Sequence, residues 1–508
     1  MCLLAAAAST WSIQPLSFVL HNGETARKYY PASVPGGFAV FDYDNDGNLD
    51  LFFANGGELP SGSKTLPEHR NLLLRNKGSL QFEDVTGKAG VHGAEYSFGA
   101  SVADYNGDGL SDLLVVGLRG VTLYRNKGNG SFSDETAASG LDNQGRWSVA
   151  VAWADIDNDR DPDLFIVNYV AWKAENDREC LVSGKPDFCH PRFYPPTANA
   201  LFRNNGDGTF TDNSEASGIA KHKGKGMSVA VADFDSDGLA DIFVTNDRSF
   251  AFFFHNRGAG KFEEAAFEFG IAAPEDGKPV SGMGIAAEDF DNDGRIDIVY
   301  TALRDETFPL YRNTGKQFTE VTSSSRLSAL TRSMSGWGIA LADLDNDGWK
   351  DIAVARSDAL SATGGRGSAA MEPPSWVRNL GNGTFAAGSG WDTMPRGMYR
   401  GLVAADMDND GCVDVVTTAL NTAAQIIRNP CQDGHSWLKV DVRILGARVR
   451  IGTQWKHVQS STGYASSYSG PLHFGLGSAK DVSVEVMYPY GEKKTIKTDV
   501  NRTIRVAP

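Results

Sequence analysis

Residues 42–50 carry the sequence Asp-Tyr-Asp-Asn-Asp-Gly-Asn-Leu-Asp, which places aspartates at positions 1, 3, 5 and 9 and a glycine at position 6. With one substitution allowed, this pattern occurs seven times in the chain of 508 residues. The copies lie at 42–50, 104–112, 155–163, 233–241, 289–297, 343–351 and 406–414. Successive copies begin 51 to 78 residues apart, which suits one propeller blade with its loops. The sequence therefore predicts a ring of seven repeats.

The spacing of the aspartates suits a hard cation. Ca²⁺ takes about six to eight oxygen ligands at about 2.3–2.6 Å. Side chains at positions 1, 3 and 5 converge when the backbone curls tightly, and glycine at position 6 permits that curl because it tolerates a positive φ. The carbonyl at position 7 and the carboxylate at position 9 complete the shell. Because carboxylates held this close repel one another without a cation, up to seven structural Ca²⁺ ions are predicted.

Five residues in each copy, at positions 1, 3, 5, 7 and 9, are the predicted ligands. They are Asp42, Asp44, Asp46, Asn48 and Asp50; Asp104, Asn106, Asp108, Leu110 and Asp112; Asp155, Asp157, Asp159, Asp161 and Asp163; Asp233, Asp235, Asp237, Leu239 and Asp241; Asp289, Asp291, Asp293, Arg295 and Asp297; Asp343, Asp345, Asp347, Trp349 and Asp351; Asp406, Asp408, Asp410, Cys412 and Asp414. Two copies depart from the pattern: Asn106 removes a charge, and Arg160 replaces the glycine. The sequence leaves the occupancy of those two loops open.

The EF-hand opens similarly, but it needs a glutamate at position 12 and helices on both sides. Position 12 is occupied by Phe53, Val115, Ile166, Val244, Tyr300, Val354 and Thr417. Short apolar runs flank the loops instead, such as residues 38–41 and 51–54 around the first copy. Because apolar runs bounded by turn residues are typical of buried strands, we expect the loops to join strands.

A second motif, Arg-Asn or once His-Asn, follows each loop in register, usually with a glycine-rich turn and a phenylalanine after it. The pairs are Arg75-Asn76, Arg125-Asn126, Arg203-Asn204, His255-Asn256, Arg312-Asn313, Arg378-Asn379 and Arg428-Asn429. Asparagine with glycine favours hairpin turns, so each unit is predicted to form four antiparallel strands. The last pair lacks a following phenylalanine strand, and residues 13–20 could supply that strand and close the ring.

The predicted fold class is therefore all-β: a seven-bladed propeller over residues 11–432 and a small β-sandwich-like domain over 433–508. Apolar and polar residues alternate in the second domain, as at 438–443 and 482–486, which is typical of half-exposed strands. From residue 434 onward the chain holds 11 basic and five acidic residues. This excess favours either a docking face for an anionic partner or glycan, or a mildly basic solvated surface.

The net charge of −15 has a local origin, because the seven loops hold 28 of the 63 acidic residues. Seven Ca²⁺ ions would bring the charge close to neutral, so we interpret the acidity as metal-site chemistry and do not expect nucleic acid as a partner. No apolar run in the sequence approaches the roughly 20 residues of a membrane span. Histidines show no zinc-site spacing, and no Gly-x-Ser-x-Gly elbow occurs.

The N-terminal residues and the cysteines both bear on location. Residues 1–10 form a short apolar run with small residues, typical of the end of a secretory signal that lacks its basic start; the alternative is a frayed cytosolic terminus. Two local cysteine pairs, Cys180 with Cys189 and Cys412 with Cys431, predict two disulfides, although four free thiols would have the same spacing. A secreted, extracellular or periplasmic protein is expected.

Propellers usually bind ligands at the mouth of the central channel, where the blade loops converge. The residues expected there are Trp147, Tyr169, Arg248, Arg304, Trp337, Arg356 and Tyr399. Residues 171–196, stapled by the first cysteine pair, would form a lid or recognition element. Aromatic residues mixed with arginine favour a binding or adhesion module for a glycan, peptide or protein, without predicted catalytic residues. The alternative is an enzyme acting on a carbohydrate or secondary metabolite at the channel mouth.

The acidic loops resemble the FG-GAP/VCBS repeats of integrin-α-type propellers, in which such loops hold calcium. Residues 446–451, 461–467 and 472–477 resemble the ASPIC/UnbV domain. The combination is similar to the cartilage acidic protein family and covers nearly the whole chain. The resemblance implies the fold and calcium binding, and it implies no single activity.

Overall fold

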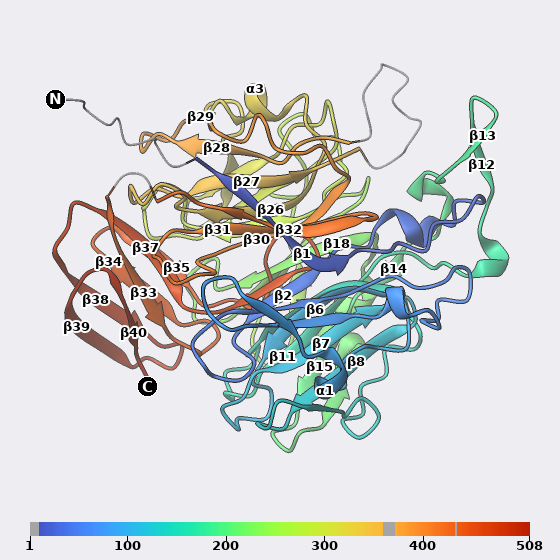
Figure 1. Ribbon diagram of the computed structural model, residues 1–508, viewed down its shortest axis with the longest axis horizontal. Helices are drawn as coiled ribbons and strands as arrows, with labels where there is room; N and C mark the ends of the chain where they lie inside the picture. The colour runs from blue at the N-terminus through green and yellow to red at the C-terminus, as the bar shows by residue number, and fades with distance from the viewer. Residues whose placement is uncertain (1–9, 359–370, 432–433, 508) are drawn as a thin grey trace.

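The computed structural model describes residues 10–358, 371–431 and 434–507, and its regular structure consists mainly of strands (Figure 1). Residues 1–9, which hold nearly all of the predicted signal remnant, lie outside the described residues. No helix in the described part of the chain has both the length and the apolar character needed to cross a membrane.

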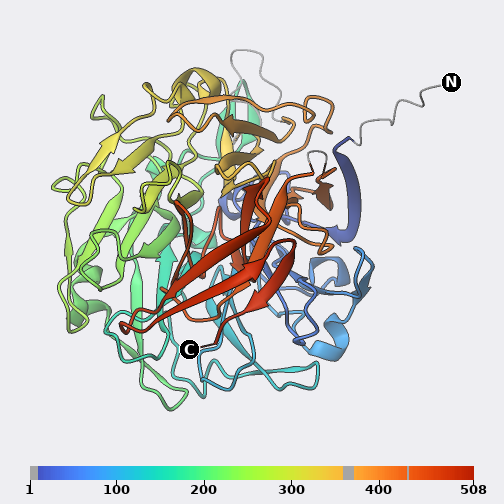
Figure 2. The same ribbon diagram turned by 90° about the vertical axis from the view of Figure 1, so that its left-hand side faces the viewer.

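The all-β propeller predicted from the repeats is confirmed. The described residues contain seven sheets in which four strands of one blade pair antiparallel, and the sheets follow one another around a common axis (Figure 2). From the axis outward, blade 1 consists of β2 (Phe38–Phe41), β3 (Asp50–Phe53), β4 (Leu72–Asn76) and β5 (Phe82–Asp84); blade 2 of β6 (Ser97–Ala103), β7 (Asp112–Gly117), β8 (Gly120–Asn126) and β9 (Phe132–Asp134); blade 3 of β10 (Ser148–Ala154), β11 (Asp163–Asn168), β15 (Ala200–Asn204) and β16 (Phe210–Asp212).

The ring continues with four more blades. Blade 4 consists of β18 (Gly226–Ala232), β19 (Asp241–Asn246), β20 (Phe252–Asn256) and β21 (Phe262–Glu264); blade 5 of β22 (Ile285–Glu288), β23 (Asp297–Tyr300), β24 (Leu310–Asn313) and β25 (Phe318–Glu320); blade 6 of β26 (Gly336–Ala342), β27 (Asp351–Arg356), β28 (Ser375–Asn379) and β29 (Phe385–Ala387); blade 7 of β30 (Tyr399–Ala405), β31 (Asp414–Ala419), β32 (Thr422–Arg428) and β1 (Ser12–Val19).

The ring closes as the N-terminal apolar stretch predicts. Strand β1 pairs antiparallel with β32, with Ser12 opposite Arg428 and Ile13 opposite Ile427. The first strand of the chain thus completes the last blade. This pairing joins the two ends of the propeller and removes an exposed sheet edge.

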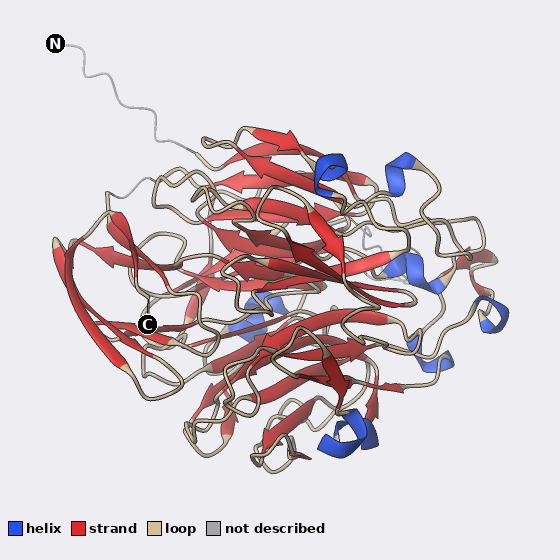
Figure 3. Ribbon diagram, turned by 90° about the horizontal axis from the view of Figure 1, so that it is seen from below, coloured by secondary structure: helices blue, strands red, loops and turns tan. Residues whose placement is uncertain are grey.

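The inner strands consist largely of apolar residues, as expected for strands whose two faces are both covered. In blade 4, every residue of β18 and β19 is buried, whereas β21 has one buried residue of three. Short elements lie in the connections (Figure 3): α1 (Thr86–Ala89), α2 (Ser214–Ser217), α3 (Leu327–Thr331), the 3-10 turns η1 (Tyr30–Ser33), η2 (Pro67–His69), η3 (Ala174–Asn176), η4 (Pro191–Phe193) and η5 (Ile219–Lys221), and the small strand pairs β12 (Cys180–Val182) with β13 (Lys185–Asp187) and β14 (Thr197–Ala198) with β17 (Lys223–Gly224).

The C-terminal residues form two packed sheets, as predicted for a small β-sandwich. One sheet has the order β37 (Leu472–Gly477), β33 (Ser436–Asp441) and β40 (Arg502–Arg505); the other has β35 (Gln454–His457), β34 (Arg448–Ile451), β38 (Asp481–Met487) and β39 (Lys493–Asp499). Leu438 and Phe474 of the first sheet share a buried cluster with Val449 and Val484 of the second. This domain lies over the centre of the ring (Figure 2).

Between β35 and β37 the C-terminal domain sends a segment, residues 458–469, into the axis of the propeller. At its end, β36 (Ser467–Ser469) adds a parallel strand to β2. Ser460 Oγ donates to the Trp153 carbonyl at 2.8 Å, and Ser461 Oγ donates to the Val229 carbonyl at 2.9 Å. The inner strands of blades 3 and 4 are thereby hydrogen-bonded to this segment, which we call the plug.

The tip of the plug, at Gly463 and Tyr464, packs against further parts of the propeller. Tyr464 is fully buried, its hydroxyl donates to the Val34 carbonyl at 2.7 Å, and its ring meets Trp337 edge-on at 5.1 Å. Gly463 adopts a φ of 60°, and an added Cβ would lie 2.8 Å from the Leu402 carbonyl oxygen of blade 7. The axis on which the sequence predicted a channel mouth is therefore filled by the chain itself.

Candidate metal centres and the domain interface

All seven acidic loops join the first strand of a blade to its second, so they gather on one face of the ring, called here the loop face. In blade 1, the Asp42 carboxylate accepts hydrogen bonds from the N–H groups of Asp46 and Gly47, each at 3.0 Å. The Asp50 carboxylate accepts from the N–H groups of Tyr43 at 3.0 Å and Asn76 at 2.7 Å. Backbone donors thus fix the carboxylates at positions 1 and 9.

The carboxylates at position 3 have less of this support, although Asp235 in loop 4 accepts from the N–H group of Asp237 at 3.2 Å. Over the described residues, one of their oxygens is buried without a hydrogen bond in four loops, at Asp44, Asp157, Asp291 and Asp408. In the first loop, ligand atoms of Asp42, Asp44 and Asp50 lie within 4.8 Å of one another. A buried carboxylate oxygen without a partner is costly unless a cation compensates it. The donor set of these loops therefore fits a hard, oxygen-seeking cation.

Burial also perturbs the acidity of the position-9 carboxyls. The pKa rises to about 8 for Asp50, Asp112, Asp163, Asp241 and Asp414. The main cause is the removal of water from the charged form, and repulsion by neighbouring aspartates adds to it. A bound cation would favour the ionised carboxylates and relieve this cost.

The arginine of the Arg-Asn motif contacts the same carboxylates from the outer side. Arg203 lies 2.7 Å from Asp157 and 3.0 Å from Asp159, at positions 3 and 5 of its own loop. The equivalent contacts are made by Arg75, Arg312, Arg378 and Arg428. In blade 4, His255 Nε2 lies 3.0 Å from Asp235. The arginines of the motif thus supply part of the counter-charge of their loops.

The asparagine of the motif joins neighbouring blades, a role that turn chemistry alone did not predict. Asn204 Nδ2 donates to the Pro162 carbonyl in its own blade at 3.1 Å and to the Tyr105 carbonyl in the preceding blade at 2.9 Å. Its backbone N–H donates to Asp163 at 2.8 Å. The equivalent interblade bonds, at 2.7 to 2.9 Å, are made by Asn76, Asn126, Asn256, Asn313, Asn379 and Asn429.

Comparison with known families agrees with this geometry. The FG-GAP-like repeat matches residues 42–115, 104–166, 184–244, 233–300 and 289–354, which together make up more than half of the chain. The chain belongs to the FG-GAP repeat family. Residues 442–508 match the ASPIC and UnbV family. The resemblance predicted from the motifs is confirmed for both parts of the chain.

Relatives extend this likeness over most of the chain. It is 26% identical to cartilage acidic protein 1 of Homo sapiens over 499 residues, covering 91% of this chain and 70% of that protein. It is 25% identical to the Mus musculus protein of the same name over 501 residues, covering 91% and 71%. The structure of an Agrocybe aegerita lectin that recognises non-reducing terminal N-acetylglucosamine aligns with a TM-score of 0.41 and 17% identity, over 70% of this chain and 79% of the lectin. The likeness to the lectin is too low to bear on a ligand.

The third FG-GAP loop has Arg160 in place of the usual glycine, and its contacts show what this arginine does. Arg160 adopts a φ of 81°, close to the 88° of Gly47 at the same position of the first loop. Its guanidinium lies over the ring of Tyr490 in the ASPIC/UnbV domain, 4.7 Å from the ring centre. Tyr490 in turn donates to the Asp155 carboxylate at 2.8 Å. The arginine costs backbone strain, and it gives the third loop a contact with the second domain.

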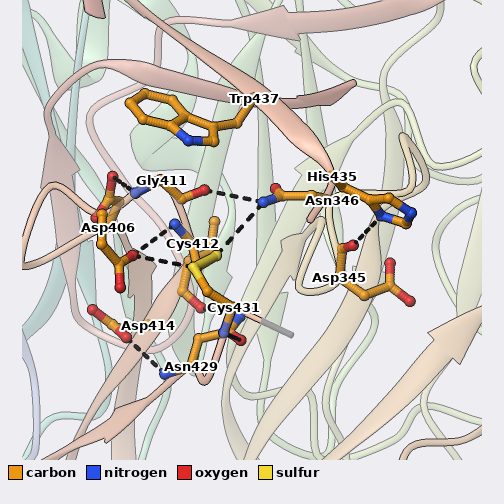
Figure 4. Close-up of a disulfide and its surroundings, with 12 residues drawn as sticks. Asp345, Asn346, Asp406, Gly411, Cys412, Asp414, Asn429, Cys431, His435 and Trp437 are labelled. Carbon is orange, nitrogen blue, oxygen red and sulfur yellow. Dashed lines mark hydrogen bonds between the residues drawn. A yellow bond between two sulfur atoms is a disulfide. The ribbon is translucent and has the colours of Figure 1, made fainter. Parts of the chain in front are cut away.

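The seventh FG-GAP loop is tied to the start of the ASPIC/UnbV domain. The predicted disulfide between Cys412 and Cys431 is present, and Figure 4 shows Trp437 lying over Gly411 beside it. An added Cβ at Gly411 would lie 1.8 Å from Trp437 Nε1, so only glycine fits at this position. Asn346 of the neighbouring loop donates to the Gly411 carbonyl at 3.0 Å. Loop 7 is thus held by a covalent bond, an indole ring and an adjacent blade.

Part of the basic excess of the ASPIC/UnbV domain is directed at the loop face. Lys439 Nζ lies 2.7 Å from the Asp406 carboxylate, and both side chains are almost fully buried. Arg448 donates to the Gly294 carbonyl at 2.7 Å, and Arg443 lies 3.7 Å from Asp42. The sequence left a docking face and a solvated surface open as explanations of this charge. These contacts show that some of the basic residues dock onto the propeller of the same chain.

The aromatic residues predicted for a ligand site on the opposite face are not exposed. Trp147, Tyr169, Trp337 and Tyr399 are 1 to 3% exposed. Tyr169 donates to the Asp247 carboxylate at 2.6 Å, and Trp337 packs against the plug. The four side chains fill the space between the inner strands and offer no surface to a ligand, so that part of the prediction is corrected.

The arginines predicted for the same site are ion-paired. Arg248 lies 3.0 Å from Glu306, while Arg304 and Arg356 both contact the buried Glu372. The predicted lid does project from this face (Figure 1), and it carries the predicted disulfide between Cys180 and Cys189. The predicted ligand residues thus lie on one face of the propeller, but their side chains are either buried or ion-paired within the protein.

Proposed function

We propose that this chain is an extracellular binding module for a glycan, peptide or protein, and that the FG-GAP loops hold structural Ca²⁺. The observation that carries the proposal is the set of buried oxygens without a hydrogen bond at position 3, in Asp44, Asp157, Asp291 and Asp408. Each belongs to a loop whose carboxylates at positions 1 and 9 accept hydrogen bonds from backbone N–H groups. The arginines contact the other oxygen of these carboxylates, and the oxygen that remains buried without a hydrogen bond favours a bound cation.

The residues proposed to hold the ion are those at positions 1, 3, 5 and 9 of each loop, together with the carbonyl at position 7. When bound, the cation would neutralise mutually repelling carboxylates and link the first two strands of a blade. The backbone bonds to Asp42 and Asp50 keep the ligands of blade 1 in place before the ion binds. This preorganisation reduces the entropy that binding would otherwise cost.

An extracellular or periplasmic location is part of the same proposal. Its support is the pair of disulfides, one at each face of the propeller. Disulfides persist mainly in oxidising compartments. Binding rather than catalysis is favoured because the histidines show no zinc-site spacing and no Gly-x-Ser-x-Gly elbow occurs in the sequence.

Thermal unfolding of the full chain, with and without excess chelator, tests the calcium part of the proposal. We expect chelation to lower the melting temperature by more than 10 °C, and Ca²⁺, but not Mg²⁺ at the same concentration, to restore it. The large effect is expected because several sites are emptied together, and each site contributes to the stability of the folded state. An unchanged melting temperature would overturn the role of calcium.

A further inference from the structure

Loop 4 (residues 233–241) differs from the other FG-GAP loops in the side chain that faces its outer side. In loop 1, Arg75 lies 2.7 Å from Asp44 at position 3. In blade 4 this arginine is replaced by His255 on strand β20, whose Nε2 lies 3.0 Å from Asp235 at position 3. A guanidinium only donates hydrogen bonds, whereas an imidazole nitrogen can also bind a metal. The exchange therefore changes what the outer side of the loop can bind.

His255 is buried, and its ring nitrogens lack hydrogen bonds. The residue is 7% exposed, and neither Nδ1 nor Nε2 forms a hydrogen bond within the described residues. The contact between Nε2 and Asp235 is short, yet the ring N–H does not point at the carboxylate oxygen as a hydrogen bond requires. Buried polar atoms are normally satisfied. The protein itself thus leaves Nε2 unsatisfied at the edge of the acidic loop.

Neighbouring aromatic rings hold the imidazole in this position. The His255 ring meets Phe269 edge-to-face, with 5.0 Å between the ring centres and an angle of 68°, and its centre lies 6.3 Å from that of Phe253. Both phenylalanines belong to one buried cluster. A ring that is packed in this way keeps its nitrogens in one place, which lowers the cost of binding an ion.

Two carboxylates lie beside Nε2. One ligand atom each of Asp235, Asp237 and His255 lies within 4.8 Å of the others. Metal–ligand bonds of about 2.0–2.2 Å place two neighbouring ligand atoms of one ion about 3 Å apart, as Nε2 and the Asp235 oxygen are. Among the residues that the structure describes, no lysine or arginine forms an ion pair with either aspartate. Asp237 is exposed, so water can reach the same point and complete the coordination.

These ligands indicate a different ion from calcium. Ca²⁺ in proteins is bound by oxygen, whereas an imidazole nitrogen suits Zn²⁺ and the neighbouring first-row transition metals. Three protein ligands with a water in the fourth position form a common type of open zinc site. In such a site His255 is neutral, with the metal on Nε2 and the proton on Nδ1. The set on loop 4, one nitrogen and two carboxylate oxygens, fits this type.

We propose that loop 4 binds Zn²⁺ through Asp235, Asp237 and His255. The ion occupies the place that the arginine of the motif has in the other blades, on the outer side of the loop. It is bound in addition to the calcium proposed for the inner side, because only one of the two Asp235 oxygens faces His255. Carboxylates can bridge two cations about 3.5–4 Å apart, as in two-metal sites. The zinc ties the loop between β18 and β19 to strand β20 of the same blade.

Zinc content of the full chain tests the proposal, measured by elemental analysis after equilibration with ZnCl₂ in calcium buffer and gel filtration. His255→Arg gives blade 4 the residue that the other six blades carry, so it should fold and keep its calcium. We expect it to bind about one Zn²⁺ fewer per chain than the unaltered protein. His92→Arg makes the same change at an exposed histidine outside the loops and should leave the zinc content unaltered. Equal zinc contents in the two variants would overturn the site.

Two further variants sharpen the test. His255→Gln removes the ligand without adding a charge and should lose the same ion, which keeps the test valid if the arginine disturbs the blade. Arg75→His places an imidazole beside Asp44 and Asp46 and should add about one Zn²⁺ per chain. An unchanged zinc content in Arg75→His would overturn the claim that histidine in place of the arginine makes the site. Melting temperatures show whether each variant is folded.

Calcium content measured on the same samples separates this proposal from the proposed function. If calcium is bound and His255→Arg loses no zinc, the zinc proposal is wrong and the calcium proposal stands. If calcium is absent and the zinc that depends on His255 is present, the calcium proposal is wrong and the zinc site stands. A loss of calcium that matches the zinc gained would overturn the joint binding of the two ions on loop 4.

Discussion

The two faces of the propeller use the same seven blades in opposite ways. On the loop face, the aspartates keep nearly the same spacing within each of the seven nine-residue loops, and the second domain covers these loops (Figure 2). On the opposite face, the connections range from two residues between β7 and β8 to the long segment between β11 and β15 that carries β12 and β13. The constant loops preserve a ligand geometry and a docking surface, while the variable connections bury their aromatic residues and pair their arginines. The repeated acidic motif in the sequence thus marks the face on which the positions of the ligand residues are most constrained.

Truncating the central side chain of the plug should have the largest effect on stability. Tyr464→Ala leaves a cavity on the axis of the ring and should lower the free energy of unfolding by about 3–5 kcal/mol. Phe267→Ala on the opposite face is the matched control, because that ring is 68% exposed; its effect should stay below about 0.5 kcal/mol. Urea denaturation measures both. Similar small effects would show that the plug contributes little to stability.

The two disulfides should differ in what they support. Replacing both Cys412 and Cys431 by serine should cost about 3 kcal/mol by the loop-closure estimate and should also release calcium, because Cys412 lies within loop 7. The disulfide between Cys180 and Cys189 closes a shorter loop, with a separation of 9 residues instead of 19. Replacing both of these cysteines by serine should leave the calcium content unchanged. Elemental analysis with thermal unfolding checks both variants. Loss of calcium from the second variant would contradict the account.

The interblade asparagines should contribute a smaller amount each. Asn256→Ala leaves the buried carbonyl of Ile156 and the part-buried carbonyl of Ala240 without their donor, and should cost about 1–3 kcal/mol in urea denaturation. Asn205→Ala is the control, because that side chain is exposed and bonds only within its own turn. Equal stability of the two variants would show that the bonds between blades add nothing.

The outer arginines should give the smallest effect. Arg203→Gln should lower the stability of the calcium-free protein by at most about 1 kcal/mol, because Arg203 is about half exposed. It should tighten calcium binding, since one competing positive charge is removed. Arg257→Gln is the control, because Arg257 pairs with the exposed Glu263 and not with a loop carboxylate. Calcium titration distinguishes them, and weaker binding by Arg203→Gln would contradict the competition.

The sequence predicted the parts of this protein that are governed by local spacing. The seven loops and the four-stranded units follow from motifs and from turn chemistry that act over a few residues. The closing strand was predicted by a different argument, because the last blade lacked a fourth strand, and the two disulfides were predicted from the short spacing of each cysteine pair. The left-handed positions inside the loops follow the same logic: Gly47 at φ 88° and Asn45 at φ 58° are residue types that tolerate a positive φ.

Long-range contacts were not predictable in the same way. The bond from Asn204 to Tyr105 joins residues 99 apart in sequence, and that from Ser460 to Trp153 joins residues 307 apart. Nothing local marks residues 458–469 as a plug, although its small residues, such as Gly463, are a signal of close approach. The aromatic residues predicted to bind a ligand failed for the same reason, because burial depends on what packs over them.

The most direct test of the account is the calcium stoichiometry of the full chain, measured by elemental analysis after gel filtration in buffer freed of metal. The account predicts close to seven Ca²⁺ per chain, one for each acidic loop, with a deficit confined to the second and third loops if their departures weaken binding. Fewer than two ions per chain would contradict it, because the buried carboxylates of the loop face would then be stabilised by something else.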